Sequence, residues 1–327
     1  MTREESNRVF HKIFRNELSE EEIREILVSL YQRGESGEEI AGAMEAMKSY
    51  AIPVHVDSEF QDRLIDNCGT GGDKSGSFNI STTTAFVMVG GGSYVAKHGN
   101  RSITSKSGSA DVLEVLGFNL DLSPMQHAIL LQNSGFTFMF AQKHHPAMKH
   151  IMPIRKSLPH RTIFNILGPL TNPANVKKQL IGVFDRSYLK PIAEALQLLD
   201  MDSAIVVSGN DGVDEVSISD ITYFVQLKHG KIVEGEIDPE KFGIRRAKFE
   251  EIKGGDAKTN GKILLDILQN RERGAKRDIV LLNSAVGFVA DGKARDIQDG
   301  LEIARESLES GKAYKAFQNT IQLSNKI

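Results

Sequence analysis

The pattern of hydrophobic and polar positions divides the chain into a helical beginning and a longer part in which strands and helices alternate. In the first fifty positions hydrophobic residues recur at helical spacing behind two capping-box motifs, Ser19 with Glu22 and Ser36 with Glu39. These short amphipathic segments predict helices that bury one face against other helices or against a second subunit.

From Leu64 onward, short apolar runs alternate with helical stretches. The runs LID, YVA, GFTFMF, QLIGVF and AIVVSG are typical of strands. A hairpin with His229 and Gly230 in its turn is expected over residues 221–237. This alternation predicts an α/β fold class, with a small all-helical domain plus a large α/β domain that has a central, mostly parallel sheet.

Composition and charge exclude several classes of protein. The chain has 327 residues, of which 40% are hydrophobic and 25% charged, and its net charge of -3 provides no global positive field for nucleic acid. With one cysteine, Cys68, it forms neither an intrachain disulfide nor a cysteine-rich metal cluster. Because no apolar run can cross a bilayer and no signal peptide is visible, we expect a cytoplasmic protein without membrane or nucleic-acid partners.

Residues 66–82, DNCGTGGDKSGSFNIST, form a glycine-rich segment between a predicted strand and a predicted helix. Gly69, Gly71 and Gly72 permit a tight turn with positive φ and allow backbone N–H groups to face a ligand. Together with nearby hydroxyls and a helix starting near Ser81, this favours a phosphate or diphosphate. Neither the P-loop nor the dinucleotide-binding pattern is present, and taken alone the segment could be a tight surface turn.

Two further loops follow predicted strands. Residues 97–111, KHGNRSITSKSGSAD, combine cations with serine and threonine hydroxyls, which suit phosphate oxygens. Asp111 is instead expected in the first turn of the next helix. In NDGVDEVS, residues 210–217, Asp214 and Glu215 offer oxygen ligands of the kind that Mg²⁺ takes together with substrate phosphates. On spacing alone, an acidic turn is the simpler explanation of this last segment.

The segments GTGGD, NIST, KHGNR, SKSGSADVLE, RTIFNILGPLTNP and DGVDE occur in an order that resembles the anthranilate phosphoribosyltransferase family over nearly the whole chain. GTGGD and NIST are also similar to segments of pyrimidine nucleoside phosphorylases, so KHGNR and RTIFNILGPLTNP are more specific. The resemblance implies transfer of phosphoribosyl from 5-phosphoribosyl-1-diphosphate (PRPP) to anthranilate, with release of diphosphate, in tryptophan biosynthesis. It also implies a Mg²⁺ cofactor, with two ions on the diphosphate substrate, and a homodimer with contacts through the helical part.

The same resemblance implies where each substrate binds. The helical domain would comprise residues 1–65 and about 160–185, and the α/β domain residues 66–159 and 186–327. No acid or base is assigned, although His98 could orient the amine. Anthranilate would lie against Gly69, His98, Asn100 and Arg155, and the metal would bind Ser81, Asp214 and Glu215. PRPP would contact Gly69, Gly72, Asp73, Ser77, Asn79, Ser81, Thr82, Lys97, Asn100, Arg101, Ser105 and Ser109.

Two alternatives stay open from the sequence. A nucleoside phosphorylase of the same fold would carry a different basic and serine-containing signature in place of KHGNR and Arg155. A homologue that had become a nucleic-acid-binding protein would show a basic groove and altered anthranilate residues. The net charge of -3 and the intact Asn100 and Arg155 argue against it. The histidines His144, His145 and His150 lack the spacing of a zinc helix, so we expect a structural role for them.

Overall fold

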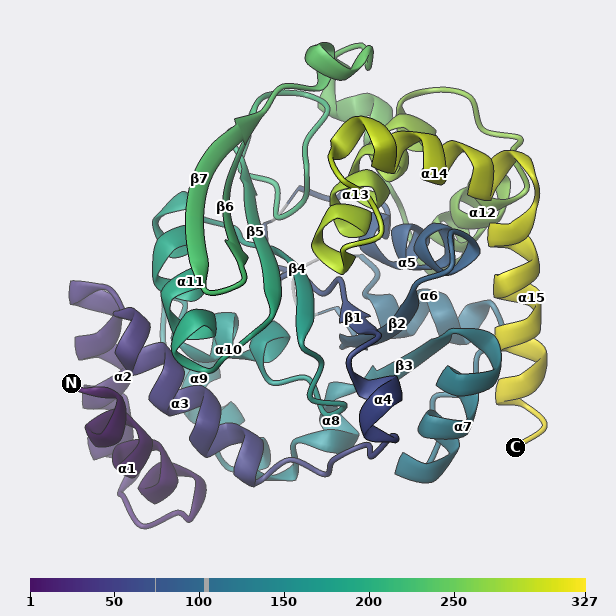
Figure 1. Ribbon diagram of the computed structural model, residues 1–327. Helices are drawn as coiled ribbons and strands as arrows, with labels where there is room; N and C mark the ends of the chain where they lie inside the picture. Colours follow the sequence, from purple (N-terminus) through teal and green to yellow (C-terminus); the bar gives the residue numbers. More distant parts are fainter. Residues whose placement is uncertain (74, 103–105) are drawn as a thin grey trace.

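A seven-stranded sheet lies at the centre of the computed structural model, which describes residues 1–73, 75–102 and 106–327 (Figure 1). Its strands are β1 Leu64–Asp66, β2 Tyr94–Gly99, β3 Phe136–Phe140, β4 Lys178–Gly182, β5 Ser203–Gly209, β6 Thr222–Lys228 and β7 Lys231–Ile237. Their order in the sheet is β3-β2-β1-β4-β5-β6-β7. The first five strands are parallel and the last two pair in antiparallel fashion, so the expected mostly parallel sheet is confirmed.

The hairpin expected near the end of the sheet is present. His229 and Gly230 have φ angles of 49° and 72°, which a two-residue turn between antiparallel strands requires at both positions. Lys228 therefore pairs directly with Lys231, and the hairpin forms one edge of the sheet.

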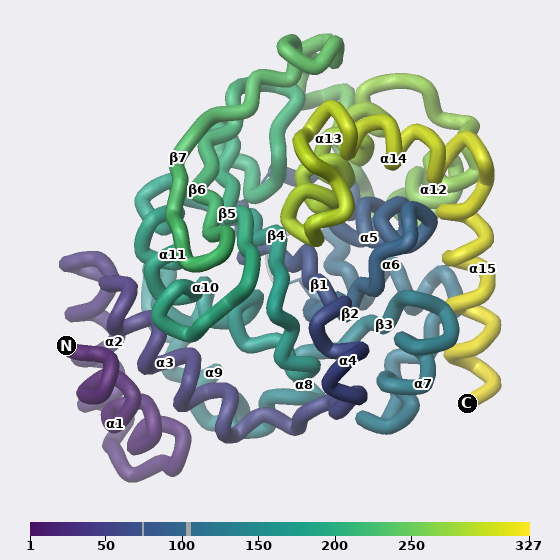
Figure 2. The backbone as a smooth tube through the Cα atoms, viewed as in Figure 1, coloured from purple at the N-terminus to yellow at the C-terminus, as the bar shows by residue number. Residues whose placement is uncertain are grey.

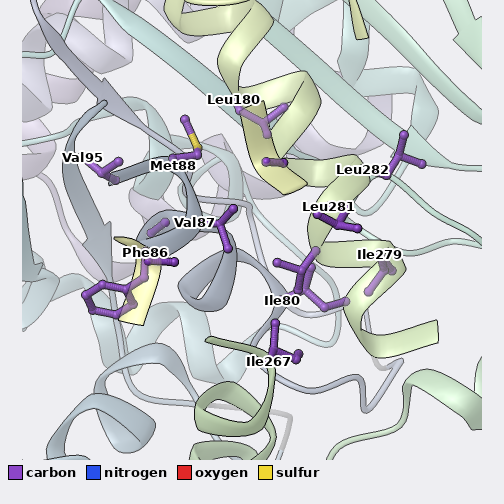
Figure 3. Packing of buried hydrophobic residues seen from close by; sticks show 14 of the residues in the cluster. Ile80, Phe86, Val87, Met88, Val95, Leu180, Ile267, Ile279, Leu281 and Leu282 are labelled. Atoms are coloured by element: carbon purple, nitrogen blue, oxygen red, sulfur yellow. The ribbon is translucent and has the colours of Figure 1, made fainter. Parts of the chain in front are cut away.

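Side chains alternate along each strand, so the sheet has an apolar layer on both faces. On β5, Ile205 and Val207 enter one core, whereas Ala204 and Val206 enter the other. Figure 3 shows part of the first core, where helical side chains gather near Leu180 of β4. The helices of this core are α5 Ile80–Gly90, α6 Ser109–Val115, α7 Pro124–Ser134, α12 Ala257–Leu268, α13 Ala275–Asp291, α14 Ile297–Glu309 and α15 Lys312–Ser324.

The second core joins the amino-terminal helices to the sheet. Its helices are α1 Arg3–Phe14, α2 Glu20–Arg33, α3 Gly37–Ser49, α9 Ile151–Ser157, α10 Phe164–Leu170 and α11 Leu189–Leu198. Ser19 and Ser36 cap α2 and α3 as predicted, each accepting a hydrogen bond from the N–H three residues later. In Figure 2 the amino-terminal helices and α15 lie at opposite sides of the molecule.

Shorter elements complete the chain. No helix among the described residues has the length and apolar character needed to cross a membrane. The short α-helices are α4 Ser58–Gln61 and α8 Ala141–His144, with four residues each. The 3₁₀ helices are η1 Pro146–Lys149, η2 Arg186–Tyr188, η3 Pro239–Phe242 and η4 Phe249–Ile252.

The second helical stretch differs from the expected range of about 160–185. β4 lies inside that range, but it is a central strand hydrogen-bonded to β1 and β5, so the end of the expected range is wrong. An apolar run such as QLIGVF suits a strand that is covered on both faces. α9 lies before the range, yet Ile151 and Ile154 pack in the second core. We therefore use the term helical part for α1–α3 together with α9 and α10.

Candidate functional site

The glycine loop, residues 68–73, lies at the carboxyl end of β1 and touches the acidic loop that follows β5. The Thr70 N–H donates to the Gly182 carbonyl at 2.8 Å, and the Gly71 N–H donates to Oδ2 of Asp214 at 2.5 Å. Gly71 has a φ of 66° and Gly72 a φ of 75°, as expected for a tight turn. Two loops that are far apart in sequence thus meet at one edge of the sheet, where ligands of open α/β folds bind.

The sequence predicts a positive φ at Gly69, but the structure requires glycine at this position for a different reason. Its φ is not positive, but a Cβ at this position would lie 2.9 Å from Oδ2 of Asp214. Gly182 is more crowded, because its Cβ would lie 1.6 Å from the carbonyl oxygen of Asp214. The expectation of a left-handed Gly69 is therefore wrong, and both glycines serve to let the acidic loop approach closely.

Three carboxylates gather at this edge. Asp73 lies close enough to Asp214 to interact electrostatically with it, and Glu215 lies beside both Asp214 and the Ser81 backbone N–H. Burial and the charge of Asp73 raise the pKa of Asp214 to about 7. Burial and the charge of Asp214 raise the pKa of Glu215 well above its usual value, against the effect of Lys97. Carboxylates that repel one another in this way fit a divalent cation, which would relieve the repulsion.

The donor set fits Mg²⁺ in particular. Within the described residues, no three His, Cys, Asp or Glu side chains are arranged to hold a metal by themselves. Mg²⁺ commonly takes only one or two protein carboxylates and completes its shell with water and substrate phosphates. Ser81, Asp214 and Glu215, which the sequence predicts as ligands, lie together at the start of α5 and offer such a partial shell.

Lys97 on β2 brings a buried cation to the same place. Its side chain is 1% exposed, and Nζ donates to Oγ of Ser81 and to the Asn67 carbonyl, each at 3.2 Å. Asn67 in turn donates through Nδ2 to the Ser81 carbonyl at 2.7 Å. The ammonium group is thus fixed beside the first turn of α5, where an anion is favoured.

Asp66 and Asn172 hold the ends of β1 and β2 together beneath the site. Asp66 accepts from Nδ2 of Asn172 at 2.7 Å and from the His98 N–H at 3.3 Å. Asn172 also donates to the Ala96 carbonyl at 2.8 Å. Burial raises the pKa of Asp66 to about 6, although Lys97 opposes the shift. Neither residue is predicted from the sequence, since nothing in either segment shows that the two meet.

The acidic loop has a positioning residue of its own that was also missed. Asn283 on α13 is buried, accepts from the Val216 N–H at 2.9 Å and donates to the Val216 carbonyl at 2.8 Å. Because Val216 follows Glu215 directly, these two bonds fix the backbone from which both acidic side chains project.

The His98 imidazole has a defined tautomer. Nδ1 lies 2.9 Å from the Gly168 carbonyl oxygen, which can only accept, so Nδ1 carries a proton. Burial and His145 lower the pKa of His98 well below its usual value, so the ring is neutral and Nε2 is an acceptor. Nε2 is buried and meets no hydrogen-bond partner in the described part of the chain. A Cβ on Gly168 would meet no atom within 4 Å, so the space beside it is open.

Arg155 lies near the same helix, α10. Its guanidinium carbon is 5.5 Å from the centre of the Phe164 ring. Phe164 and Gly168 are four residues apart on α10, which is about 6 Å along the axis at the usual rise. Burial lowers the pKa of Arg155 to about 10, so the group stays charged at neutral pH. Its hydrogen bond goes to Sδ of Met152 at 3.5 Å, and a cation in such apolar surroundings suits an anionic ligand.

The KHGNR loop directs its arginine toward α6. Arg101 forms ion pairs of 2.8 Å with both Asp111 and Glu114, so its guanidinium is already engaged by the chain. Asp111 also accepts from the Gly108 N–H at 2.8 Å, which confirms the expected place in the first turn of α6. Oδ1 of Asn100 accepts from the Arg101 N–H at 2.8 Å.

Of the remaining predicted PRPP contacts, Asn79 and Thr82 lie at the start of α5. Asn79 is held from α12, because Nδ2 of Asn260 donates to its Oδ1 at 2.9 Å. The Thr82 hydroxyl is buried and has no hydrogen-bond partner within the described ranges. The others are Ser77, whose Oγ lies 3.2 Å from that of Ser75, Ser109, the first residue of α6, and Ser105, which lies outside the described residues.

Two of the three clustered histidines, His144 and His150, bind backbone groups. Nδ1 of His144 lies 2.8 Å from the Ile52 carbonyl oxygen, and Nε2 of His150 lies 2.9 Å from that of Ile13. These bonds tie the segment before α9 to the amino-terminal helices, which is a structural role. Burial raises the pKa of the Cys68 thiol, in keeping with a packing residue.

Two family models together account for most of the chain. Residues 61–314 match the glycosyl transferase family, a/b domain, and residues 1–51 match the glycosyl transferase family, helical bundle domain. The fold and these two matches thus define a glycosyltransferase with a large α/β domain and a helical bundle domain.

Full-length relatives narrow this class. Anthranilate phosphoribosyltransferase of Rubrobacter xylanophilus is 44% identical over 323 residues, which are 99% of this chain and 93% of that protein. The crystal structure of the Thermus thermophilus enzyme of the same name matches with a TM-score of 0.93 at 38% identity, covering 99% and 96% of the two chains. The Saccharomyces cerevisiae enzyme in complex with PRPP and Mg matches with a TM-score of 0.86 at 28% identity, covering 94% of this chain and 86% of that chain. The chain belongs to the anthranilate phosphoribosyltransferase family.

Proposed function

We propose that this chain transfers the phosphoribosyl group of PRPP to the amine of anthranilate and releases diphosphate, a step of tryptophan biosynthesis. The observation that supports it most is the meeting of the glycine loop, the buried Lys97 and the pair Asp214 and Glu215 at one sheet edge. Full-length relatives carry the name of this activity, and the yeast relative binds PRPP and Mg.

Each substrate has its own set of groups in this proposal. PRPP takes the residues predicted from the sequence around the glycine loop, the start of α5 and the KHGNR loop, with Lys97 as the buried cation on the diphosphate. Ser81, Asp214 and Glu215 hold Mg²⁺, with two ions in all when the diphosphate is bound. The metal supplies positive charge that stabilises the leaving diphosphate.

Anthranilate would lie on the other side of the reacting carbon, along α10. Arg155 binds its carboxylate through two parallel hydrogen bonds, which the planar guanidinium permits. Gly69 and Asn100 line the same subsite. Nε2 of His98 accepts a hydrogen bond from the amine, since the Gly168 carbonyl fixes the proton on the other nitrogen. An aromatic amine has a free lone pair at neutral pH, so positioning replaces a strong general base.

The direct test uses purified protein with anthranilate, PRPP and Mg²⁺, and follows the fall of anthranilate fluorescence. Loss of fluorescence that requires all three components supports the proposal. Phosphorolysis of thymidine with phosphate, and no reaction with anthranilate, would identify a nucleoside phosphorylase instead. Salt-dependent retention of DNA without any turnover would identify a nucleic-acid-binding protein.

Quaternary structure and location belong to the same proposal. We propose a homodimer formed through the helical part, where Tyr31 of α2 is 45% exposed. Light scattering after size exclusion should then give twice the 36.1 kDa of one chain. A cytoplasmic location stays a prediction, which cell fractionation can check.

A further inference from the structure

Arg161 connects the helical part to the glycine loop, and none of the roles assigned above includes it. It lies between α9 and α10. Its Nη2 donates to the Gly72 carbonyl, and its guanidinium carbon lies 3.6 Å from the centre of the Phe184 ring. A Cβ on Gly72 would be 3.8 Å from Nη2 of Arg161, so the guanidinium lies directly against the loop.

We propose that Arg161 is a positioning residue for PRPP, which holds the peptide between Gly72 and Asp73 in one orientation. This inference rests on the proposed function. The peptide is trans, so its C=O and N–H point in opposite directions. With the Gly72 carbonyl on Arg161, the Asp73 N–H points away from the guanidinium. Because Gly71 and Gly72 have no side chains to restrict rotation, the orientation depends on an outside contact.

Two other contacts hold the preceding residues of the loop. The Gly71 N–H donates to Asp214, and the Thr70 N–H donates to Gly182 at the end of β4. Phe184 follows that same strand end, so β4 supports the loop both directly and through the ring under Arg161. Loss of Arg161 would leave the first two contacts in place and release only the Gly72 peptide. Affinity for PRPP should therefore fall, while the anthranilate subsite on α10 keeps its groups.

The experiment compares Arg161→Ala with Arg186→Ala, a matched control. Arg186 also stacks on an aromatic ring, with its guanidinium carbon 3.5 Å from the centre of Tyr223, and it follows the same strand. Steady-state kinetics with both substrates and the thermal midpoint are measured for each variant. Arg161→Ala should raise KM for PRPP about tenfold, equivalent to about 1.4 kcal/mol, with little change in KM for anthranilate. Arg186→Ala should change neither KM.

Two conservative variants separate positioning from general packing. Arg161→Lys keeps the charge but loses the planar stack, so an intermediate KM for PRPP is expected. Phe184→Leu keeps an apolar side chain but removes the ring, and should give a similar intermediate value. The inference is overturned if KM for PRPP in Arg161→Ala equals that of the Arg186 control, or if both KM values rise together with a lower thermal midpoint.

A second measurement does not depend on turnover. Hydrogen–deuterium exchange of the substrate-free protein should show faster exchange at residues 71–73 in Arg161→Ala than in the wild type or in Arg186→Ala. Faster exchange in a protein without transferase activity would support the loop role while the proposed function fails. Unchanged exchange in an active enzyme would reject the loop role and leave the function standing.

Discussion

Arg155 shows at the scale of one residue how a local environment indicates a ligand. Its guanidinium is partly buried against Phe164, and burial lowers its pKa to about 10 without abolishing its charge. Arg155→Ala should therefore raise KM for anthranilate about tenfold to a hundredfold, the range for hydrogen bonds to charged groups. KM for PRPP should change little. Arg24→Ala, which removes a cation that bonds to Ser157 at the end of α9, is the control. An unaltered KM for anthranilate in Arg155→Ala would refute the assignment.

Asp214 and Glu215 make the metal assignment testable at the same scale. Replacing both by Ala removes the carboxylates that complete a Mg²⁺ shell with substrate oxygens. Activity should fall by about a hundredfold or more, as for lost electrostatic stabilisation of a leaving group, and the Mg²⁺ dependence should flatten. Glu234→Ala removes an exposed carboxylate on β7 and should leave the Mg²⁺ response intact. A double variant that keeps the wild-type response shows that the metal lies elsewhere.

Residue types were predictable from the sequence, but residue partners were not. The glycines, Lys97 and the acidic pair stand in segments whose chemistry suits phosphate and metal, and short motifs reveal this. A glycine at position 69 was expected because it permits a positive φ. It is needed instead because a Cβ there would crowd the Asp214 side chain. The ion pairs of Arg101 with Asp111 and Glu114 were not predicted. These differences arise from contacts between distant segments, which no local pattern encodes.

At the scale of elements, α10 combines poor helix residues with a role in the site. Glycine inside a helix costs about 1 kcal/mol relative to alanine, and a Cβ on Gly168 would meet no atom within 4 Å. Pro169 follows, however, and a Cβ on the residue before a proline disfavours the helical conformation, so Gly168→Ala should leave the thermal midpoint unchanged or lower it slightly. The added methyl enters the space beside the carbonyl that binds His98, so KM for anthranilate should rise about tenfold or more, the effect of a methylene-sized change in a pocket. An unchanged KM would show that anthranilate binds away from α10.

The junction of α2 and α3 contains a buried carboxylate with consequences for acid stability. Burial alone would raise the pKa of Glu39, but hydrogen bonds from Arg33, the amino terminus and Ser36 lower it to about 2. A depressed carboxyl pKa contributes stability that is complete above the usual value of 4.5 and is lost as pH falls toward 2. Glu39→Gln should cost about 1.5–3 kcal/mol at neutral pH. Denaturant unfolding should show this difference shrinking below pH 4.5, and a constant difference would contradict the assignment.

At the scale of the whole molecule, the class of fold was predictable and the strand order was not. Apolar runs such as AIVVSG predict strands because parallel strands are buried on both faces. The order β3-β2-β1-β4-β5 depends on which runs meet across the sheet, and those pairings are long-range. The helical part also depends on contacts between segments far apart in sequence, since α9 packs with the amino-terminal helices through Ile151 and Ile154.

One continuous core links α1 to the sheet, so the helices and the sheet should unfold together. Phe10 of α1 and Val206 of β5 belong to the same buried cluster, and Phe10 is 0% exposed. Phe10→Ala should cost about 3–5 kcal/mol and lower a single calorimetric transition, while both KM values measured well below that transition stay unchanged. Val233→Ala, at a side chain 58% exposed on β7, should leave the transition in place. Two transitions, of which Phe10→Ala moves only one, would show that the helical part unfolds independently of the sheet.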